Sequence, residues 1–296
     1  MTKIINDLNT FLQSSFTLEK ISYKSFLLKT EDNRSFILKL NHKNNQKVYR
    51  LLKNSGVRNV IYPLYTALID NNLVELFPYY ENNRYQNKQK LLNMQDALKN
   101  MHLKTQIKIL VGKKQISYLE QIYKILDAKF LMLELLMQEV EFKEYKDDFD
   151  WLYLANYHHY LDIKKQMYHL NQKIKKFIEK TPSITYVLNH GQPSINHLVN
   201  MRLISFNNAK MAIPVSDIAK FYILNDHIKV DWFKVIDDWL NIYNEPFFKS
   251  YFKFLVYYIY LINIDFTSTE LHLHMQSFSN ITSKIKIFST YFYTYQ

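Results

Sequence analysis

The chain has 296 residues, of which 48% are hydrophobic and 16% aromatic, enough for one large domain or a two-lobed one with a sizeable core. It contains no cysteine, which excludes a disulfide scaffold, thiolate zinc sites and a cysteine nucleophile. Three glycines argue against an all-β protein rich in tight turns, and the net charge of +11 comes from scattered lysines, so we interpret it as a solvated basic surface and not as a nucleic-acid site.

The first 80 residues are predicted to form a small antiparallel sheet plus one helix, after a short amphipathic helix at the N-terminus. Apolar residues recur at helical spacing over residues 3–15 and again over Asn41–Lys53, where Gly56 suits the helix end. Turn residues separate the apolar runs between and after these helices. The predicted strands are Leu18–Tyr23, Ser25–Thr30, Ser35–Leu40, Val60–Leu68 and Leu73–Pro78.

Residues 81–296 are predicted to be a helical lobe interrupted by one short β excursion. A β-rich lobe at residues 1–80 followed by this larger lobe predicts an α+β, two-lobed architecture. The predicted helices are Leu91–Leu103, Ile116–Val140, Trp151–Lys180, Ser216–Leu224, Asp231–Ile242, Glu245–Ile264, a stretch near Ser268–Phe278, and Thr282–Tyr295.

The β excursion contains the candidate site. An apolar run at Ile184–Leu188 leads into His190 and Gly191, and Gly191 is one of the three glycines. Asn196 follows in the loop, and a second apolar run comes at Leu203–Phe206. This order is typical of an active-site loop: a strand, a glycine turn, an amide side chain and a second strand.

These motifs resemble the aminoglycoside phosphotransferase and choline-kinase-like branch of the protein-kinase fold, and most of all its spore-coat-associated kinase-like members. The resemblance covers most of the chain. Four segments carry it, namely Phe36-Ile37-Leu38-Lys39, Ala97-Leu98-Lys99-Asn100-Met101-His102, the His190-Gly191 loop ending at Asn196, and Leu203-Ile204-Ser205-Phe206 followed by Ser216-Asp217-Ile218-Ala219.

The resemblance implies a role for each matching position. Lys39 would hold the α- and β-phosphates of a nucleotide, and Asn196 would hold a magnesium ion. Gln192, two residues after His190, stands where the family has its catalytic Asp, and Ser205 stands where it has the metal-binding Asp. The remaining matches, Gly191 and Asp217, would be structural, with Asp217 accepting backbone N–H groups of the catalytic loop.

Several departures from the family pattern indicate that catalytic groups have been lost. A carboxamide such as Gln192 cannot accept a proton at neutral pH. No acidic residue lies between Asp32 and Asp70, so a local partner for Lys39 is missing, and residues 14–25 contain no glycine for a phosphate-covering loop. The short spacing from Asn196 leaves the register of Ser205 open by one or two residues, but no acidic residue lies between Glu179 and Asp217 to restore a metal ligand.

We therefore predict a catalytically inactive, kinase-like protein that acts as a binding or structural component, with association with a spore coat as one option. The alternative is an atypical ATP-dependent small-molecule phosphotransferase. No cofactor is expected. ATP and Mg²⁺ are expected to bind only if residual nucleotide binding persists. A protein partner or assembly is expected, with no nucleic acid and a cytoplasmic location. No membrane span is expected, because the most apolar run, Phe254–Ile264, is shorter than the ~20 residues of a spanning helix.

Two further features keep alternative interpretations. The aromatic helix that begins near Phe247 is either the core of the helical lobe or an assembly surface. The acidic cluster Asp147-Asp148-Asp150 is either a solvated turn between helices or a cation site.

Overall fold

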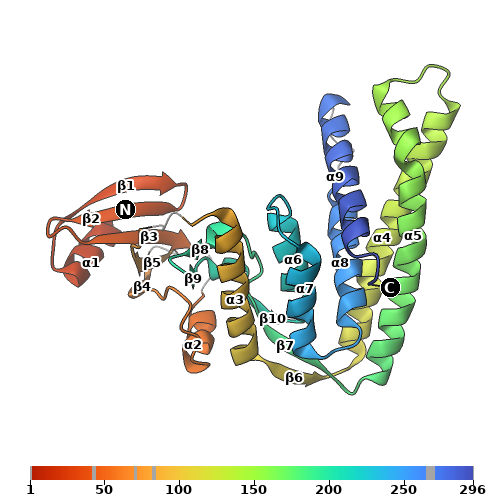
Figure 1. The fold of residues 1–296 in the computed structure, drawn as a ribbon. Helices are drawn as coiled ribbons and strands as arrows, with labels where there is room; N and C mark the ends of the chain where they lie inside the picture. Colours follow the sequence, from red (N-terminus) through yellow and green to blue (C-terminus); the bar gives the residue numbers. More distant parts are fainter. Residues whose placement is uncertain (1, 42–44, 70–71, 82–84, 265–270, 296) are drawn as a thin grey trace. The chain divides into compact units, whose positions relative to one another are not determined.

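The computed structural model describes residues 2–41, 45–69, 72–81, 85–264 and 271–295 (Figure 1). Contacts between Cα atoms divide the chain into two compact units, residues 1–106 with 187–211, and residues 107–186 with 212–296. The predicted fold class is confirmed: an antiparallel sheet fills the N-terminal part, and the remainder is mostly helical. The lobe boundary near residue 80 stays a prediction.

The first unit contains a five-stranded antiparallel sheet. Its strands lie in the order β1-β2-β3-β5-β4, so the fifth strand in sequence inserts beside the third. The predicted hairpin between β2 and β3 is present, and Arg34 Nε donates to Asp32 Oδ2 at 2.7 Å in its turn. The strands are β1 (Phe16–Ser22), β2 (Ser25–Thr30), β3 (Ser35–Asn41), β4 (Tyr65–Ile69) and β5 (Asn72–Pro78).

One face of this sheet forms a core with the N-terminal helix α1 (Thr2–Leu12). Alternate residues of a strand point to opposite faces, so Leu38 of β3 joins this core. Ile37 and Lys39 must then lie on the other face of β3. The core side chains are Ile4, Leu8, Leu12, Leu28, Phe36, Leu38, Ile69, Val74 and Leu76.

Two helices of the first unit differ in detail from their predictions. α2 (Gln46–Asn54) begins later than predicted, and Asn41, where the helix was predicted to begin, belongs to β3. Its buried residues are Tyr49 and Leu52, whereas the predicted inward positions also included Val48 and Leu51. The stop at Gly56 is confirmed by its φ of +67°. α3 (Asn87–Thr105) extends the predicted helix at both ends.

The candidate loop follows strand β7 (Ser183–Asn189), the centre of a three-stranded sheet with the order β10-β7-β6. Beyond the turn, the short strands β8 and β9 pair antiparallel, and Ile61 donates its backbone N–H to the carbonyl of Leu203 at 3.0 Å. The elements are η1 (Ile195–His197), β8 (Leu198–Val199), β9 (Arg202–Leu203), η2 (Phe206–Asn208) and β10 (Lys210–Ala212).

The second unit is mostly helical. Strand β6 (Ile107–Leu110), which the sequence did not predict, pairs with residues 183–186 of β7. The two segments predicted near Ser268–Phe278 and at Thr282–Tyr295 form one helix in the described residues, α9 (Leu271–Tyr291). The other helices are α4 (Lys113–Phe142), α5 (Asp148–Lys180), α6 (Val215–Asn225), α7 (Trp232–Leu240) and α8 (Phe248–Ile262).

The structure distinguishes between the alternatives for the aromatic helix and for the acidic cluster. Most aromatic side chains of α8 are buried, including Phe252 and Phe254 at 0% exposure, as in a core helix. The side chain of Asp147 caps α5 by accepting the backbone N–H of Asp150 at 2.9 Å, and the side chain of Asp150 accepts the backbone N–H of Asp147 at 3.0 Å. The acidic cluster is therefore a helix N-terminus, where carboxylates are favourable.

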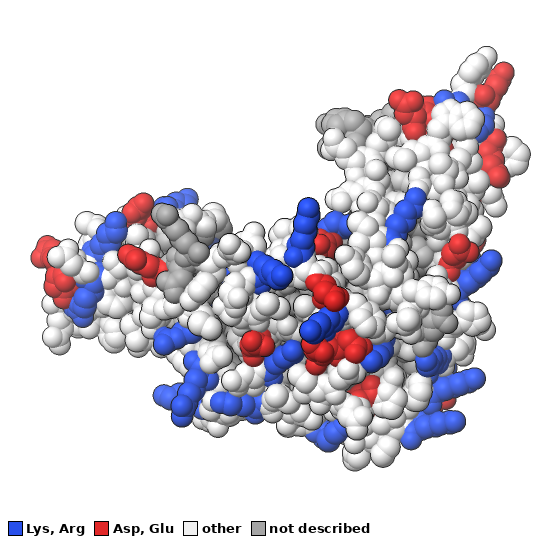
Figure 2. Space-filling view, viewed as in Figure 1, with Lys and Arg blue, Asp and Glu red and all other residues white. Residues whose placement is uncertain are grey.

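Two surface properties complete the description. None of the helices in the described part of the chain combines the length and the hydropathy that a bilayer crossing requires. Lys and Arg side chains are scattered among Asp and Glu side chains over the face in Figure 2. This face shows mixed charge and no single basic field.

Candidate functional site

Lys39 lies near the end of β3, on the sheet face opposite the α1 core. Its Nζ donates to the hydroxyl of Ser205 at 3.2 Å and lies 5.4 Å from the ring centroid of Phe77. Burial lowers the pKa of Lys39, and the negative charge of Glu75 opposes that shift. The structure thus brings together two residues that the sequence had placed 166 positions apart and assigned to one site.

Glu75 supplies a carboxylate that the sequence analysis did not find. It lies directly opposite Lys39 in the β3–β5 ladder and is 1% exposed. Directly opposed residues of neighbouring antiparallel strands have adjacent side chains. The prediction that no acidic residue lies locally around Lys39 holds, but the sheet order brings one from β5.

Ser205 occupies a constrained position. Its φ of 67° and ψ of 59° are left-handed, which is uncommon for a residue other than glycine. The following Phe206 is fully buried, 5.8 Å from the ring of Tyr49 and 5.0 Å from the ring of His190. The packing of Phe206 therefore restrains the neighbouring Ser205, and a left-handed backbone of this kind persists only where the surrounding structure holds it.

The glycine turn is held against the same segment. Gly191 has a φ of +83°, and a Cβ at this position would overlap the backbone of Asn208. Asn208 Nδ2 also donates to Gln192 Oε1 at 3.3 Å, and His197 Nδ1 lies 2.7 Å from the Gln192 carbonyl oxygen. Gln192 is thus connected to two parts of the loop, while its side chain remains exposed.

His190 is engaged in holding the loop. It is 0% exposed, and its Nε2 lies 2.7 Å from the carbonyl oxygen of Ile204. Because a carbonyl only accepts, Nε2 carries the proton, which leaves Nδ1 to accept the N–H of Gln192 at 3.4 Å. Both ring nitrogens of a neutral His190 therefore serve hydrogen bonds of the loop.

The other predicted residues are placed differently. Asn196 is exposed in η1, and among the described residues it makes no hydrogen bond to Lys39 or Ser205. Asp217 lies in the first turn of α6 and is 0% exposed. His102, from the predicted helix-end motif, is also fully buried, near the end of α3.

A cavity of about 300 Å³ opens beside Lys39 within the first unit. Apolar side chains line most of it, and Lys39 and Ser205 form a polar part of the wall. A flat, partly apolar ring with an anionic substituent fits such a lining. The lining residues are Ile21, Ser25, Ile37, Lys39, Ile61, Phe77, Pro78, Tyr79, Tyr80, Val199, Ile204 and Ser205.

The sequence contained a signal for part of this cavity. Ile37 is two residues before Lys39, so strand periodicity places both on one face. The aromatic and aliphatic contributions from Phe77, Tyr80 and Ile204 carry no local signal, because they reach the cavity through the sheet order and the β8–β9 turn.

The donors at this site do not fit a magnesium ion. Mg²⁺ is bound through one or more carboxylates, whereas Ser205 and Asn196 offer neutral oxygens. Glu75 is buried in the ladder opposite Lys39. No three potential metal-ligating His, Asp or Glu side chains come together among the described residues.

Comparison with known proteins identifies the fold. No family model matches the sequence, and no curated protein matches it significantly. An aminoglycoside phosphotransferase from Alicyclobacillus acidocaldarius superposes with a TM-score of 0.63 at 11% identity, over 94% of this chain and 91% of that one.

Two further solved structures give a TM-score of 0.51. One is an aminoglycoside phosphotransferase in complex with GDP and kanamycin, at 11% identity over 97% of this chain and 99% of that one. The other is a variant of an aminoglycoside 2′-phosphotransferase with GDP, at 10% identity over 98% and 97%. The chain therefore has the kinase-like fold of these phosphotransferases, as the sequence predicted.

Proposed function

We propose that this protein is a non-catalytic member of the kinase-like fold that binds a nucleotide in the cavity beside Lys39. The contact of 3.2 Å between Lys39 Nζ and the Ser205 hydroxyl carries this proposal. A retained lysine faces a neutral hydroxyl at the place where the resemblance expects the metal-binding carboxylate. The apolar walls and the ammonium group can still hold a base and a phosphate.

In this proposal, phosphoryl transfer is absent because a general base and carboxylate ligands for a metal ion are missing. General-base help contributes about 10²–10⁴-fold to rate, and Gln192 cannot supply it. Stabilisation of the transferring phosphoryl group by a metal ion is the other main contribution, and the donors present do not suit Mg²⁺. Binding then serves to stabilise or signal a conformation, and association with a protein partner, a spore coat included, belongs to the same proposal.

Nucleotide-dependent thermal stability tests the binding. ATP and GTP are both used, because proteins of similar fold were solved with GDP. At 100 times the dissociation constant, binding stabilises by about 2.7 kcal/mol, and we expect the same gain with and without Mg²⁺. Lys39→Met should abolish the gain, whereas Lys29→Met, a change at an exposed lysine of the neighbouring strand, should keep it. An unchanged melting temperature with both nucleotides would refute the binding.

An atypical ATP-dependent phosphotransferase remains the second candidate, because the fold extends over nearly the whole of a structure solved with GDP and kanamycin. Magnesium-dependent turnover that is lost in Gln192→Ala would establish it and reject the first proposal. The double substitution Gln192→Asp with Ser205→Asp tests the alignment itself: it should create magnesium-dependent nucleotide binding, and its failure would count against the register of Ser205.

A further inference from the structure

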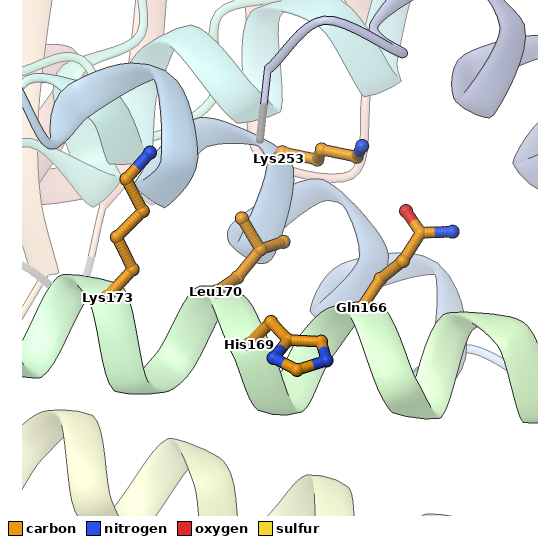
Figure 3. Close-up of a pocket in the computed structure, with 5 residues that line it drawn as sticks. All are labelled: Gln166, His169, Leu170, Lys173 and Lys253. Carbon is orange, nitrogen blue, oxygen red and sulfur yellow. The ribbon is translucent and has the colours of Figure 1, made fainter.

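A second cavity lies within the other unit, where α5 passes α8. Its volume is about 250 Å³, more than the ~150 Å³ that holds benzene and less than the ~300 Å³ at which drug-sized sites begin. Gln166, His169, Leu170 and Lys173 come from α5, and Lys253 comes from α8 (Figure 3). The size suits a small metabolite.

Lys253 is the unusual member of this set. It is 3% exposed on a helix whose other buried positions, apart from Ser250, are apolar or aromatic. One turn earlier on the same helix, Lys249 forms an ion pair with Asp237 at 2.6 Å. Among the residues that the structure describes, no carboxylate pairs with Lys253 in this way. Burial lowers the pKa of Lys253, as expected for an ammonium group with no counter-ion in the described part of the chain.

A buried cation without a partner is costly, and a bound anion offsets that cost. Figure 3 shows the Lys253 ammonium and the Gln166 amide ending on the same side of Leu170, with Lys173 on its other side. Tyr257 donates its hydroxyl to Gln166 Oε1 at 3.4 Å, which leaves the amide NH₂ to donate. The described residues of the cavity wall thus offer hydrogen-bond donors, and none of them is acidic.

The surroundings define the size and polarity of the ligand. His169 and Lys173 are exposed, so the polar mouth of the cavity is open to solvent, while Leu170 is buried and gives an apolar contact. We propose that this cavity binds a small organic anion, whose carboxylate or phosphate group contacts Lys253 and Gln166 and whose carbon skeleton packs on Leu170. This site is separate from the cavity beside Lys39 and does not depend on nucleotide binding.

Thermal unfolding of the full chain with inorganic phosphate and with succinate tests the proposal, at constant ionic strength set with sodium chloride. We expect a saturable rise in melting temperature with at least one of the two anions. Lys253→Met should remove the saturable part and also raise the melting temperature without anion, because it deletes a buried charge and keeps the apolar stem. Lys249→Met is the matched control on the same helix and should keep the anion response.

Isothermal titration calorimetry with the same anions covers the case in which Lys253→Met does not fold. Gln166→Leu should then weaken binding by roughly tenfold, since it removes one hydrogen bond to a charged group. An equal anion response in wild type and Lys253→Met would overturn the proposal. So would the lack of any saturable response up to about 10 mM, ten times the ~1 mM dissociation constant of a weak site.

Discussion

Replacing Gly191 by Ala tests how the candidate loop is held. The φ of +83° is left-handed, and an added Cβ would overlap the carbonyl oxygen of Asn208 and lie 2.7 Å from its carbonyl carbon. Gly56 offers a matched control, because its φ of +67° is similar and nothing lies within 4 Å of its added Cβ. The two substitutions differ mainly in the close approach to Asn208.

The expected magnitudes follow from these two environments. A left-handed Ala costs about 1–2 kcal/mol, of which ~0.4–1 kcal/mol is regained because Ala restricts the unfolded chain. Gly56→Ala should therefore cost about 1 kcal/mol. At Gly191, displacement of a packed backbone adds about 1–3 kcal/mol. With about 2–4 °C of melting temperature per kcal/mol in large domains, Gly191→Ala should melt at least ~2 °C below Gly56→Ala.

Differential scanning fluorimetry of wild type and both variants measures this difference. Equal melting temperatures for the two variants would refute the reasoning, because the contact with Asn208 would then contribute nothing. A second readout is nucleotide-dependent stabilisation. Gly191→Ala should weaken it by displacing Asn208 and with it the η2 segment that follows Ser205 of the cavity wall, whereas Gly56→Ala should leave it intact.

Two further predictions concern buried carboxylates. Asp217→Ala should lower the free energy of unfolding by about 1–3 kcal/mol in chemical denaturation, because we expect this fully buried carboxylate to accept backbone N–H groups that the substitution would leave unsatisfied; an unchanged midpoint would contradict that role. Burial alone would raise the pKa of Asp150, but Lys143 at 2.8 Å and the backbone N–H of Asp147 outweigh it and lower that pKa. A carboxylate with a lowered pKa stabilises the folded state at pH values above its unfolded pKa of ~3.9, and this stability is lost as the pH falls through the folded pKa. In an acid unfolding series, wild type should therefore lose its stability advantage over Asp150→Asn below about pH 4. A constant difference in stability down to about pH 2 would contradict this role of Asp150.

Local patterns in the sequence predicted most of the elements. Alternation in β2 and β3 and the turn at Asp32 predicted the hairpin, and helical periodicity predicted α4 and α5 to within a few residues. The predicted start of one helix was wrong: α2 begins at Gln46, and Asn41, the predicted start, belongs to β3. Such boundaries depend on ladder hydrogen bonds that local propensity does not encode.

For the candidate site, the sequence determined the residue types, and the tertiary structure decided their neighbours. Lys39, Gly191, Gln192 and Ser205 were predicted from motif spacing, and the loss of the carboxylates that the resemblance implies stays a prediction. The sequence could not pair Lys39 with Glu75, because that contact depends on β5 inserting between β3 and β4. Likewise, the local sequence shows Lys253 only as a lysine within an aromatic helix. Its place in the wall of a cavity depends on the packing of α5 beside α8. Periodicity tells which face of an element a side chain occupies, but the partner on that face is set by contacts between segments far apart in the chain.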